Sequence, residues 1–224
     1  MPDWPGFYST AQVSRLTRIP GSTLYEWKRR GIIAPDVEIL NERGQVVDHG
    51  YSYADLTIIK IMRAVGEDRL DLKSVHGTLR HLFQRLGPPA GGWANAHVYI
   101  VGNKVYAEQP DEWDVTAATQ SGQRAERRLF GDMFEELRDL EEPGAVLIPP
   151  DFRPFVEINP AVMGGDPVVK DTRVPTSILA ALRRKGKSPA ELAKLYRPIT
   201  ERFIEKAIEY EEYLDSEIAE PSAA

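Results

Sequence analysis

Positively charged side chains gather near the start of this chain, in a segment that holds one acidic residue. Between Arg15 and Arg30 there are five basic residues, and the one acid is Glu26. Guanidinium and ammonium groups at this density can neutralise the closely spaced phosphates of duplex DNA. Because the net charge of the whole chain is −6, any affinity for DNA must come from this local surface. The alternative is that the basic face is only solvated.

The end of the chain has the opposite charge. From Glu201 to Glu220 there are eight acidic and two basic residues. Such a surface repels phosphate, and it fits a partner with a basic surface. The alternative is a solvated helix face followed by a disordered tail at 220–224.

Catalytic and metal-binding patterns are not indicated. The four histidines are dispersed, and His76 and His81 are five residues apart rather than the four that chelate a metal on a helix. There is no cysteine, which excludes disulfides, thiol catalysis and cysteine-bound zinc. Gly164-Gly165 lacks the helix and lysine of a phosphate-binding loop. We therefore expect no metal, no cofactor and no enzyme activity.

Targeting signals are also not indicated. No apolar run approaches 18 residues, and the first residues lack the charged-then-apolar pattern of a signal peptide. Together with the lack of cysteine, this predicts a cytoplasmic protein.

The sequence predicts a helix-turn-helix that positions the basic segment. Ser9 and Gln12 have the spacing of a capping box, Pro20-Gly21 interrupts the helix, and Ser22 is expected to cap a second helix that Gly31 ends. Leu24 and Trp27 form the packing face of the second helix. Two strands at 37–40 and 45–47 predict a wing, and helices with Ser52 as cap and at about 71–86 follow.

This segment resembles a MerR-type winged helix-turn-helix. The residues that carry the resemblance are 8–13, Thr23-Leu24, 29–35 and 51–56. The resemblance implies that the second helix enters the major groove and that the wing contacts the DNA backbone. The family usually has an arginine where this chain has Tyr25, so a bidentate contact between that arginine and guanine is not expected.

The middle of the chain is expected to connect two modules. Gly87–Gly92 is a flexible break, and strands at 96–101 and 104–107 around Gly102-Asn103 predict a tight hairpin. Such a ribbon should pack on something or pair with a partner. A helix with an apolar stripe from Leu129 to Leu140 follows, and it serves either the core or a dimer or partner surface.

The last third predicts a short hairpin followed by three helices. Strands are expected at 155–160 and 168–170, a cap at Thr176 or Ser177, a stop at Gly186, a capping box at Ser188–Glu191 and a cap at Thr200. The expected apolar faces of the helices include Ile178, Leu179, Ala181, Leu182, Leu192, Ala193, Leu195, Tyr196, Phe203, Ile204, Ala207, Ile208, Tyr210 or Tyr213, and Leu214.

This stretch resembles the small helix-turn-helix domain of unknown function found in VapB-type antitoxins. The matching residues are Asn159-Pro160, 165–176 and 186–191. Asp171 stands where the family usually has glycine, and Asp tolerates left-handed backbone better than most residues. The combination of modules implies an antitoxin that represses its own operon and neutralises a PIN-type ribonuclease.

The expected fold is therefore mainly α with small β-hairpins. It divides into a winged helix-turn-helix at 1–90, a connector of hairpin and amphipathic helix at 91–150 and a C-terminal helix-turn-helix domain at 151–224. A homodimer is expected, because helix-turn-helix proteins usually bind DNA as symmetric dimers. The alternatives are a MerR-like regulator without a toxin, whose C-terminal module serves dimerisation or effector binding, and a purely structural interaction protein.

Two sets of site residues are expected. The DNA-binding candidates are exposed polar or basic positions of the first module: Arg15, Arg18, Ser22, Thr23, Tyr25, Lys28, Arg29 and Arg43. Tyr25, Lys28 and Arg29 are the candidates for groove contacts, whereas Arg15, Arg18 and Thr23 are expected to touch phosphate. The candidates for binding a partner protein lie on the acidic last helix: Glu209, Glu211, Glu212, Tyr213 and Asp215.

Overall fold

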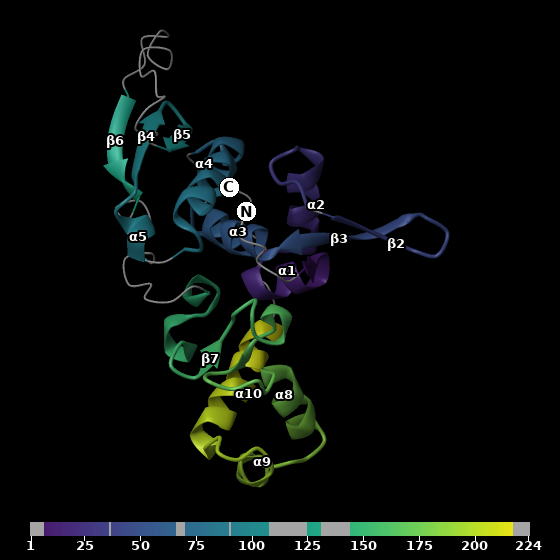
Figure 1. Cartoon of the computed structure of the whole chain (residues 1–224). Coiled ribbons are helices and arrows are strands. Elements are labelled where there is room, and N and C mark those ends of the chain that lie inside the picture. The colour runs from purple at the N-terminus through teal and green to yellow at the C-terminus, as the bar shows by residue number, and fades with distance from the viewer. Residues whose placement is uncertain are drawn as a thin grey trace.

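The computed structural model describes residues 7–35, 37–65, 70–89, 91–107, 125–130 and 144–216. It is mainly helical, with three small antiparallel sheets in the described residues. The winged module, the β4–β6 sheet and the C-terminal helices occupy three separate regions of the ribbon (Figure 1). No helix in the described ranges is long and apolar enough to cross a membrane.

The N-terminal module is a winged helix-turn-helix, as predicted. Its elements are β1 (Phe7–Ser9), α1 (Thr10–Thr17), α2 (Gly21–Arg29), β2 (Val37–Leu40), β3 (Val46–Ser52) and α3 (Tyr53–Val65). The capping box of Ser9 and Gln12 is present, and Gly31 has the positive φ of 65° that ends a helix. Ser52 and Asp55 form a second capping box at the start of α3.

One predicted cap of this module is wrong. Helix α2 begins at Gly21 with Pro20 as its N-cap, so Ser22 lies within the first turn and caps nothing. The backbone N–H of Leu24 donates to the carbonyl of Pro20, which places the start of the helix earlier than the serine pattern predicts. Ser22 is therefore exposed on the surface of α2.

The wing is a long hairpin that extends from the body of the molecule (Figure 1). Strand β3 lies between β1 and β2 in the sheet, and a bulge occurs next to Ile39 and Leu40. Strand β1 was not expected from the sequence, because three residues are too short to show alternation. It holds the base of the wing against the helices, since Tyr8 pairs with Tyr51 and both side chains are buried.

The first module ends with helix α4 (Leu72–Leu86), which Asp71 caps, and the connector begins with a short helix α5 (Gly91–Ala94). The predicted hairpin is present as β4 (His97–Val101) and β5 (Lys104–Ala107), with Gly102 at a φ of 63°. Strand β6 (Ala125–Leu129) pairs with the other edge of β4, so the hairpin does not stand alone. Leu129 ends a strand, and Phe130 follows it as a buried helical residue. The rest of the predicted stripe, from 131 to Leu140, lies outside the described residues.

The C-terminal module has the predicted hairpin and three helices. Short helical turns η2 (Ala145–Leu147), η3 (Pro150–Phe152) and η4 (Met163–Gly165) surround the strands β7 (Val156–Glu157) and β8 (Val168–Val169), and the helices are α8 (Thr176–Arg184), α9 (Pro189–Leu195) and α10 (Glu201–Asp215). The stop at Gly186, the capping box of Ser188 and Glu191 and the N-cap position of Thr200 are confirmed. Asp171 adopts a φ of 60°, as its tolerance of left-handed backbone allows.

Several details of this module differ from the expectation. Pro175 is the N-cap of α8, and the hydroxyl of Thr176 instead donates to Glu211 and lies 3.2 Å from the carbonyl oxygen of Pro167. Ile178 and Leu195 are 44% and 64% exposed, because α8 and α9 pack on α10 over a narrow face that includes Leu179 and Leu192. In the first module, Leu86 is likewise exposed at the end of α4.

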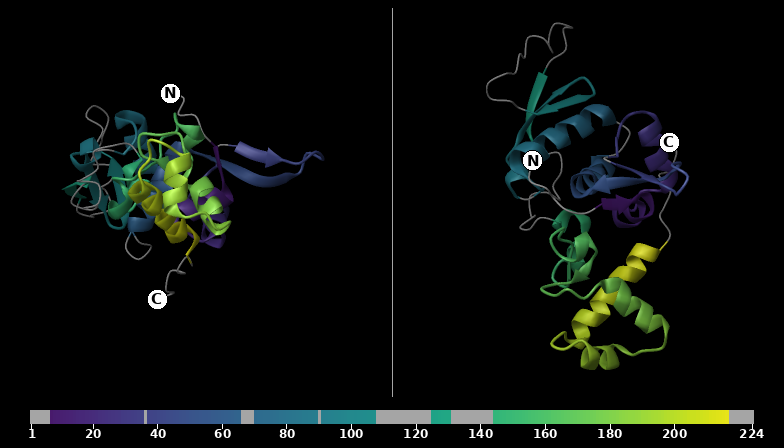
Figure 2. Two further views of the ribbon diagram at one scale, coloured as in Figure 1. Left: turned by 90° about the horizontal axis from the view of Figure 1, so that it is seen from below. Right: turned by 45° about the vertical axis from the view of Figure 1, so that its right-hand side comes forward.

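Helix α10 joins the two modules. Its first half packs in a C-terminal core through Ile204, Ala207 and Ile208, whereas Tyr210 and Leu214 belong to the large core that begins at Tyr8. In Figure 2 (right) this helix runs from α9 toward α1. The last helix of the chain is therefore packed partly against the first module.

Candidate nucleic-acid interface

The candidate interface is formed by α2 and the wing. Leu24 and Trp27 are buried, which fixes the orientation of α2 on α1. Ser22, Tyr25 and Arg29 are exposed and follow one another at intervals of three and four residues, so they lie on one face of the helix. Tyr25 is 66% exposed, so its ring and hydroxyl group are accessible from solvent.

Lys28 and Arg29 differ in their surroundings. The ammonium group of Lys28 lies against the imidazole of His49 on β3, 3.4 Å from Nδ1 and closer to Nε2, and so connects α2 to the base of the wing. Arg29 pairs with Glu26 one turn earlier through Nε and Nη2, each at 2.8 Å. The hydrogen bonds from Arg29 lower the pKa of Glu26. Both cations stay at the surface of the helix, where a phosphate could compete for them.

The wing carries few positive charges. Arg43, at the tip of the hairpin, is the one base in 37–50, against the acids Glu38, Glu42 and Asp48. The exposed side chains of the strands are largely apolar and include Val37, Ile39, Leu40, Val46 and Val47. A contact between this wing and the phosphate backbone of DNA would therefore be made mainly by the tip of the hairpin.

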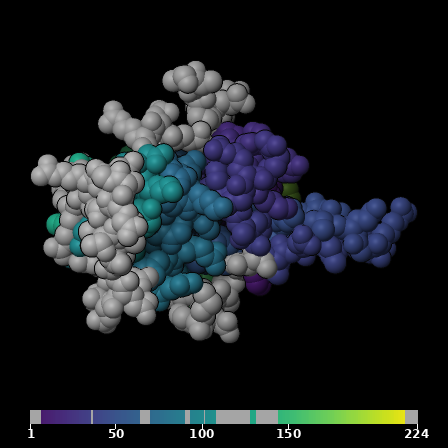
Figure 3. All heavy atoms as spheres, turned by 90° about the horizontal axis from the view of Figure 1, so that it is seen from above, coloured from purple at the N-terminus to yellow at the C-terminus, as the bar shows by residue number. Residues whose placement is uncertain are grey.

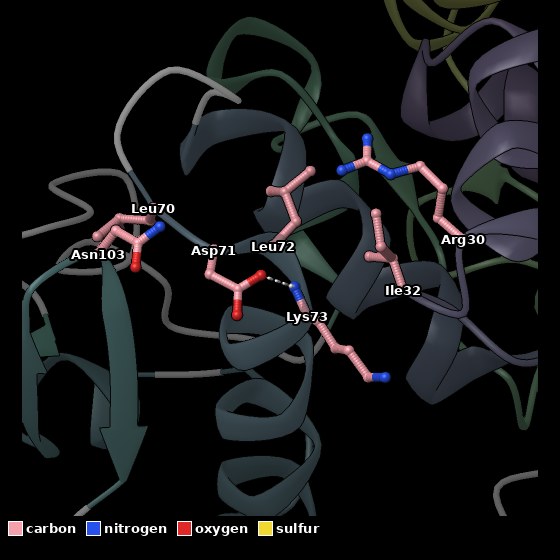
Figure 4. A pocket seen from close by; sticks show the side chains of 7 residues that line it. All are labelled: Arg30, Ile32, Leu70, Asp71, Leu72, Lys73 and Asn103. Atoms are coloured by element: carbon pink, nitrogen blue, oxygen red, sulfur yellow. Dashed lines mark hydrogen bonds between the residues drawn. The ribbon is translucent and has the colours of Figure 1, made fainter. Parts of the chain in front are cut away.

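Viewed from above, α2 and the wing lie beside each other on one face of the molecule, and the wing extends beyond the globular part (Figure 3). A hollow of about 360 Å³ lies between the end of α2 and the start of α4, lined by Arg30, Ile32, Leu70, Asp71, Leu72, Lys73 and Asn103. Figure 4 shows that Asp71 is turned to the backbone of α4, where it accepts from the N–H of Lys73. The carboxylate of Asp71 therefore serves as the N-cap of α4.

Arg15 and Arg18 do not lie with this group. Both side chains extend from α1 to the end of α10, where Arg15 pairs with Glu211 and Asp215 and Arg18 binds backbone oxygens of the last turn. Of the eight DNA-binding candidates, these two are thus engaged by a helix from the other end of the chain. Sequence reasoning could not separate them from the rest, because their partners lie about 200 positions away along the chain.

The candidates for binding a partner protein are divided in the same way. Glu211 is buried and accepts hydrogen bonds from Thr176 and Arg15, which corrects the expectation that it is available to a partner. Tyr213 is half-buried beside Phe152 and Tyr210, and Asp215 binds Arg15 and Arg184. Glu209 and Glu212 are exposed on the surface of α10, although Glu209 pairs with Lys206 on the same helix.

Comparison with known proteins agrees with this arrangement. Residues 8–82 match the family described as "MerR HTH family regulatory protein", and residues 156–210 match "Protein of unknown function (DUF433)". The chain carries a MerR-family helix-turn-helix domain followed by a DUF433 domain. The MerR-family match covers α1, α2, the wing, α3 and most of α4, and it points to a DNA-binding regulator.

One similar solved structure covers nearly the whole chain. The crystal structure of Rv2018 from Mycobacterium tuberculosis matches with a TM-score of 0.52 and 16% sequence identity, over 90% of this chain and 96% of that one. At this identity the match shows a shared fold. No curated protein matches the chain.

Proposed function

We propose that this protein regulates transcription by binding duplex DNA through α2 and the tip of the wing. The observation that carries the proposal is the exposed face of Ser22, Tyr25 and Arg29 next to a projecting wing, within a segment that matches MerR-family regulators. Lys28 and Arg43 would bind phosphates on either side of this face. Tyr25 would contact bases through its ring and hydroxyl group, in place of an arginine reading guanine.

The first experiment identifies the DNA sequence and then removes the charges. Sequences selected from a randomised duplex pool are titrated with the wild type and with the double variant Lys28→Ala, Arg29→Ala, by fluorescence anisotropy at several salt concentrations. Loss of the phosphate contact of Lys28 should reduce the slope of log K against log salt by about 0.9, and the loss of Arg29 removes a contact in the groove, so we expect at least a tenfold loss of affinity at low salt.

The control is Lys194→Ala, which removes one exposed cation from α9, away from α2 and the wing. It should leave affinity and slope nearly unchanged. If the double variant binds as tightly as the wild type while both remain folded by circular dichroism, the interface does not lie on α2.

For the C-terminal module we propose the role of an antitoxin, which binds and neutralises a PIN-type ribonuclease and represses the operon that encodes both. Support comes from the resemblance of this module to VapB-type antitoxins and from the exposed carboxylates of Glu209 and Glu212, which suit a basic nuclease surface. The alternative is a regulator without a toxin, whose C-terminal module serves dimerisation or effector binding.

An adjacent reading frame tests the antitoxin proposal. It should encode a small protein whose expression stops growth, and co-expression of the present chain should restore growth. In a pull-down, Glu209→Lys with Glu212→Lys should retain much less of that nuclease than the wild type, because like charges then face each other. Asp151→Lys, an exposed reversal outside α10, is the control. Equal retention by all three proteins would place the nuclease elsewhere, and lack of a growth-inhibiting neighbour would favour the alternative.

We also propose that the protein acts on DNA as a homodimer, because helix-turn-helix regulators usually match the two-fold symmetry of their sites. Selected sequences should then contain inverted half-sites at a fixed spacing. Analytical ultracentrifugation of the complex gives the stoichiometry, and one chain bound to an asymmetric site would contradict the proposal.

A further inference from the structure

The guanidinium group of Arg15 is held by two carboxylates of α10. Its Nη2 lies 2.6 Å from Oε2 of Glu211 and 2.7 Å from Oδ1 of Asp215, and its Nε lies 2.9 Å from the same Asp215 oxygen. Burial disfavours the charged form of Arg15, but the hydrogen bonds to both acids outweigh this effect and raise the pKa of Arg15. The two carboxylates thus accept hydrogen bonds from the same N–H groups of Arg15 that would donate to the oxygens of a phosphate.

Arg18 binds the end of the same helix. Its Nη1 donates to the carbonyl oxygens of Tyr213 and Ser216 and to the hydroxyl of Ser216, and the guanidinium lies 4.7 Å from the centre of the Tyr213 ring. Helix α10 has no basic residue in its own last turn. A cation from α1 therefore satisfies the carbonyls at this C-terminus and interacts favourably with the helix dipole.

These contacts use the two arginines of α1 that could otherwise neutralise DNA phosphates. We propose that the end of α10 is an autoinhibitory latch: its oxygens occupy Arg15 and Arg18 in the free protein, and the two arginines bind phosphate only after the end of α10 leaves them. This inference rests on the proposed DNA binding. It adds that the DUF433 module lowers the affinity of the winged module for DNA.

The exposure of the groups is consistent with a contact that can open. The side chains of Arg15 and Asp215 are 33% and 46% exposed, so water and salt reach this pair, and its net contribution to stability is small. Glu211 is the buried member, at 3% exposure, and it also accepts from Thr176 of its own module. Glu211 keeps the hydrogen bond from Thr176 when Arg15 leaves it, but it loses its cation, so opening of the latch costs free energy that the new phosphate contacts must offset.

The test removes the exposed carboxylate of the latch. Asp215→Asn and the wild type are titrated with a mixed-sequence 30-base-pair duplex, whose binding is almost entirely electrostatic, over a range of salt concentrations. Release of Arg15 to one phosphate should raise affinity at low salt by several-fold and steepen the slope of log K against log salt by about 0.9. Glu211→Gln acts on the same guanidinium and should shift both quantities in the same direction.

Two further variants separate the latch from a general effect of charge. Glu209→Gln removes one negative charge from the same helix without a contact to α1, and it should change affinity by less than about twofold. Arg15→Gln added to Asp215→Asn should abolish the gain. If Asp215→Asn and Glu209→Gln have the same affinity and slope, there is no latch, although the wild type still binds DNA. If no variant binds the duplex even at low salt, the proposed DNA binding fails, and the latch with it.

Discussion

At the scale of single residues, burial decides which side chains are available for chemistry. His76, on α4, illustrates this: burial and, to a smaller extent, the nearby charge of Arg80 lower its pKa from 6.5 to about 4. The ring of His76 is therefore uncharged in the folded protein at physiological pH. His76 is thus a partly buried side chain that carries no charge at neutral pH.

This pKa predicts how stability changes with acid. Between pH 6.5 and 4 the unfolded chain binds a proton at His76 that the native chain does not, so stability falls as the pH falls, by up to about 1.4 kcal/mol per pH unit. Below pH 4 both states are protonated and this contribution levels off. Urea unfolding from pH 7 to pH 4 measures the effect. His76→Gln should remove this part of the slope, and an unchanged slope would show that His76 does not titrate in this way.

At the scale of elements, an ion pair joins α3 to α4. Asp55 is 3% exposed, accepts from the backbone N–H and hydroxyl of Ser52, and lies 2.7 Å from Nη1 of Arg80. Asp55 thus caps its own helix and also fixes the neighbouring one. The capping pattern of Ser52 is visible in the sequence, whereas the pairing with Arg80 depends on how the two helices cross.

Breaking this pair should be costly. Arg80→Met keeps most of the apolar stem but leaves the buried carboxylate of Asp55 without its cation, so we expect a loss of about 3 kcal/mol in the free energy of unfolding. Lys73→Met, an exposed position on the same helix, should change it by less than about 0.5 kcal/mol. Chemical denaturation followed by circular dichroism compares the two. Equal losses in the two variants would mean that the ion pair of Asp55 and Arg80 does not stabilise the fold.

At the scale of the whole molecule, two of the contacts among the described residues show how the two modules are joined. One is the contact of α1 with α10. The other is a close approach of Tyr8 to Gly165, where the tyrosine hydroxyl donates to the glycine carbonyl at 3.2 Å. Gly165 has a φ of 90°, and a Cβ at this position would lie 1.8 Å from the hydroxyl oxygen of Tyr8. The strand that anchors the wing is therefore packed directly against the DUF433 module.

A double-mutant cycle tests this second junction. Gly165→Ala should lower the free energy of unfolding by more than about 2 kcal/mol, from the clash and the strained backbone together. Tyr8→Phe loses one hydrogen bond and should cost about 1 kcal/mol. In the double variant part of the clash is gone, so the loss should be smaller than the sum of the single losses. Additive losses would show that the two residues do not interact.

The sequence by itself determined the local structure. Ser9, Ser188 and Gly186 act as predicted because caps and stops are made by residues a few positions apart, and the same holds for the hairpin at Gly102 and the wing. Ser22 and Thr176 were wrong as caps because Pro20 and Pro175 begin their helices earlier. Strands β1 and β6 were missed, since short strands gain their stability from partners far along the chain.

Only the tertiary structure decided which charges are available. The sequence groups Arg15 and Arg18 with the basic residues of α2, and Glu211 and Asp215 with the acids of α10, because it shows each charge only beside its neighbours in the chain. In the folded protein these four residues lie together, across about 200 positions of sequence. The physical reason is that charge attraction acts through space and that burial of Tyr210 and Leu214 brings α10 to α1.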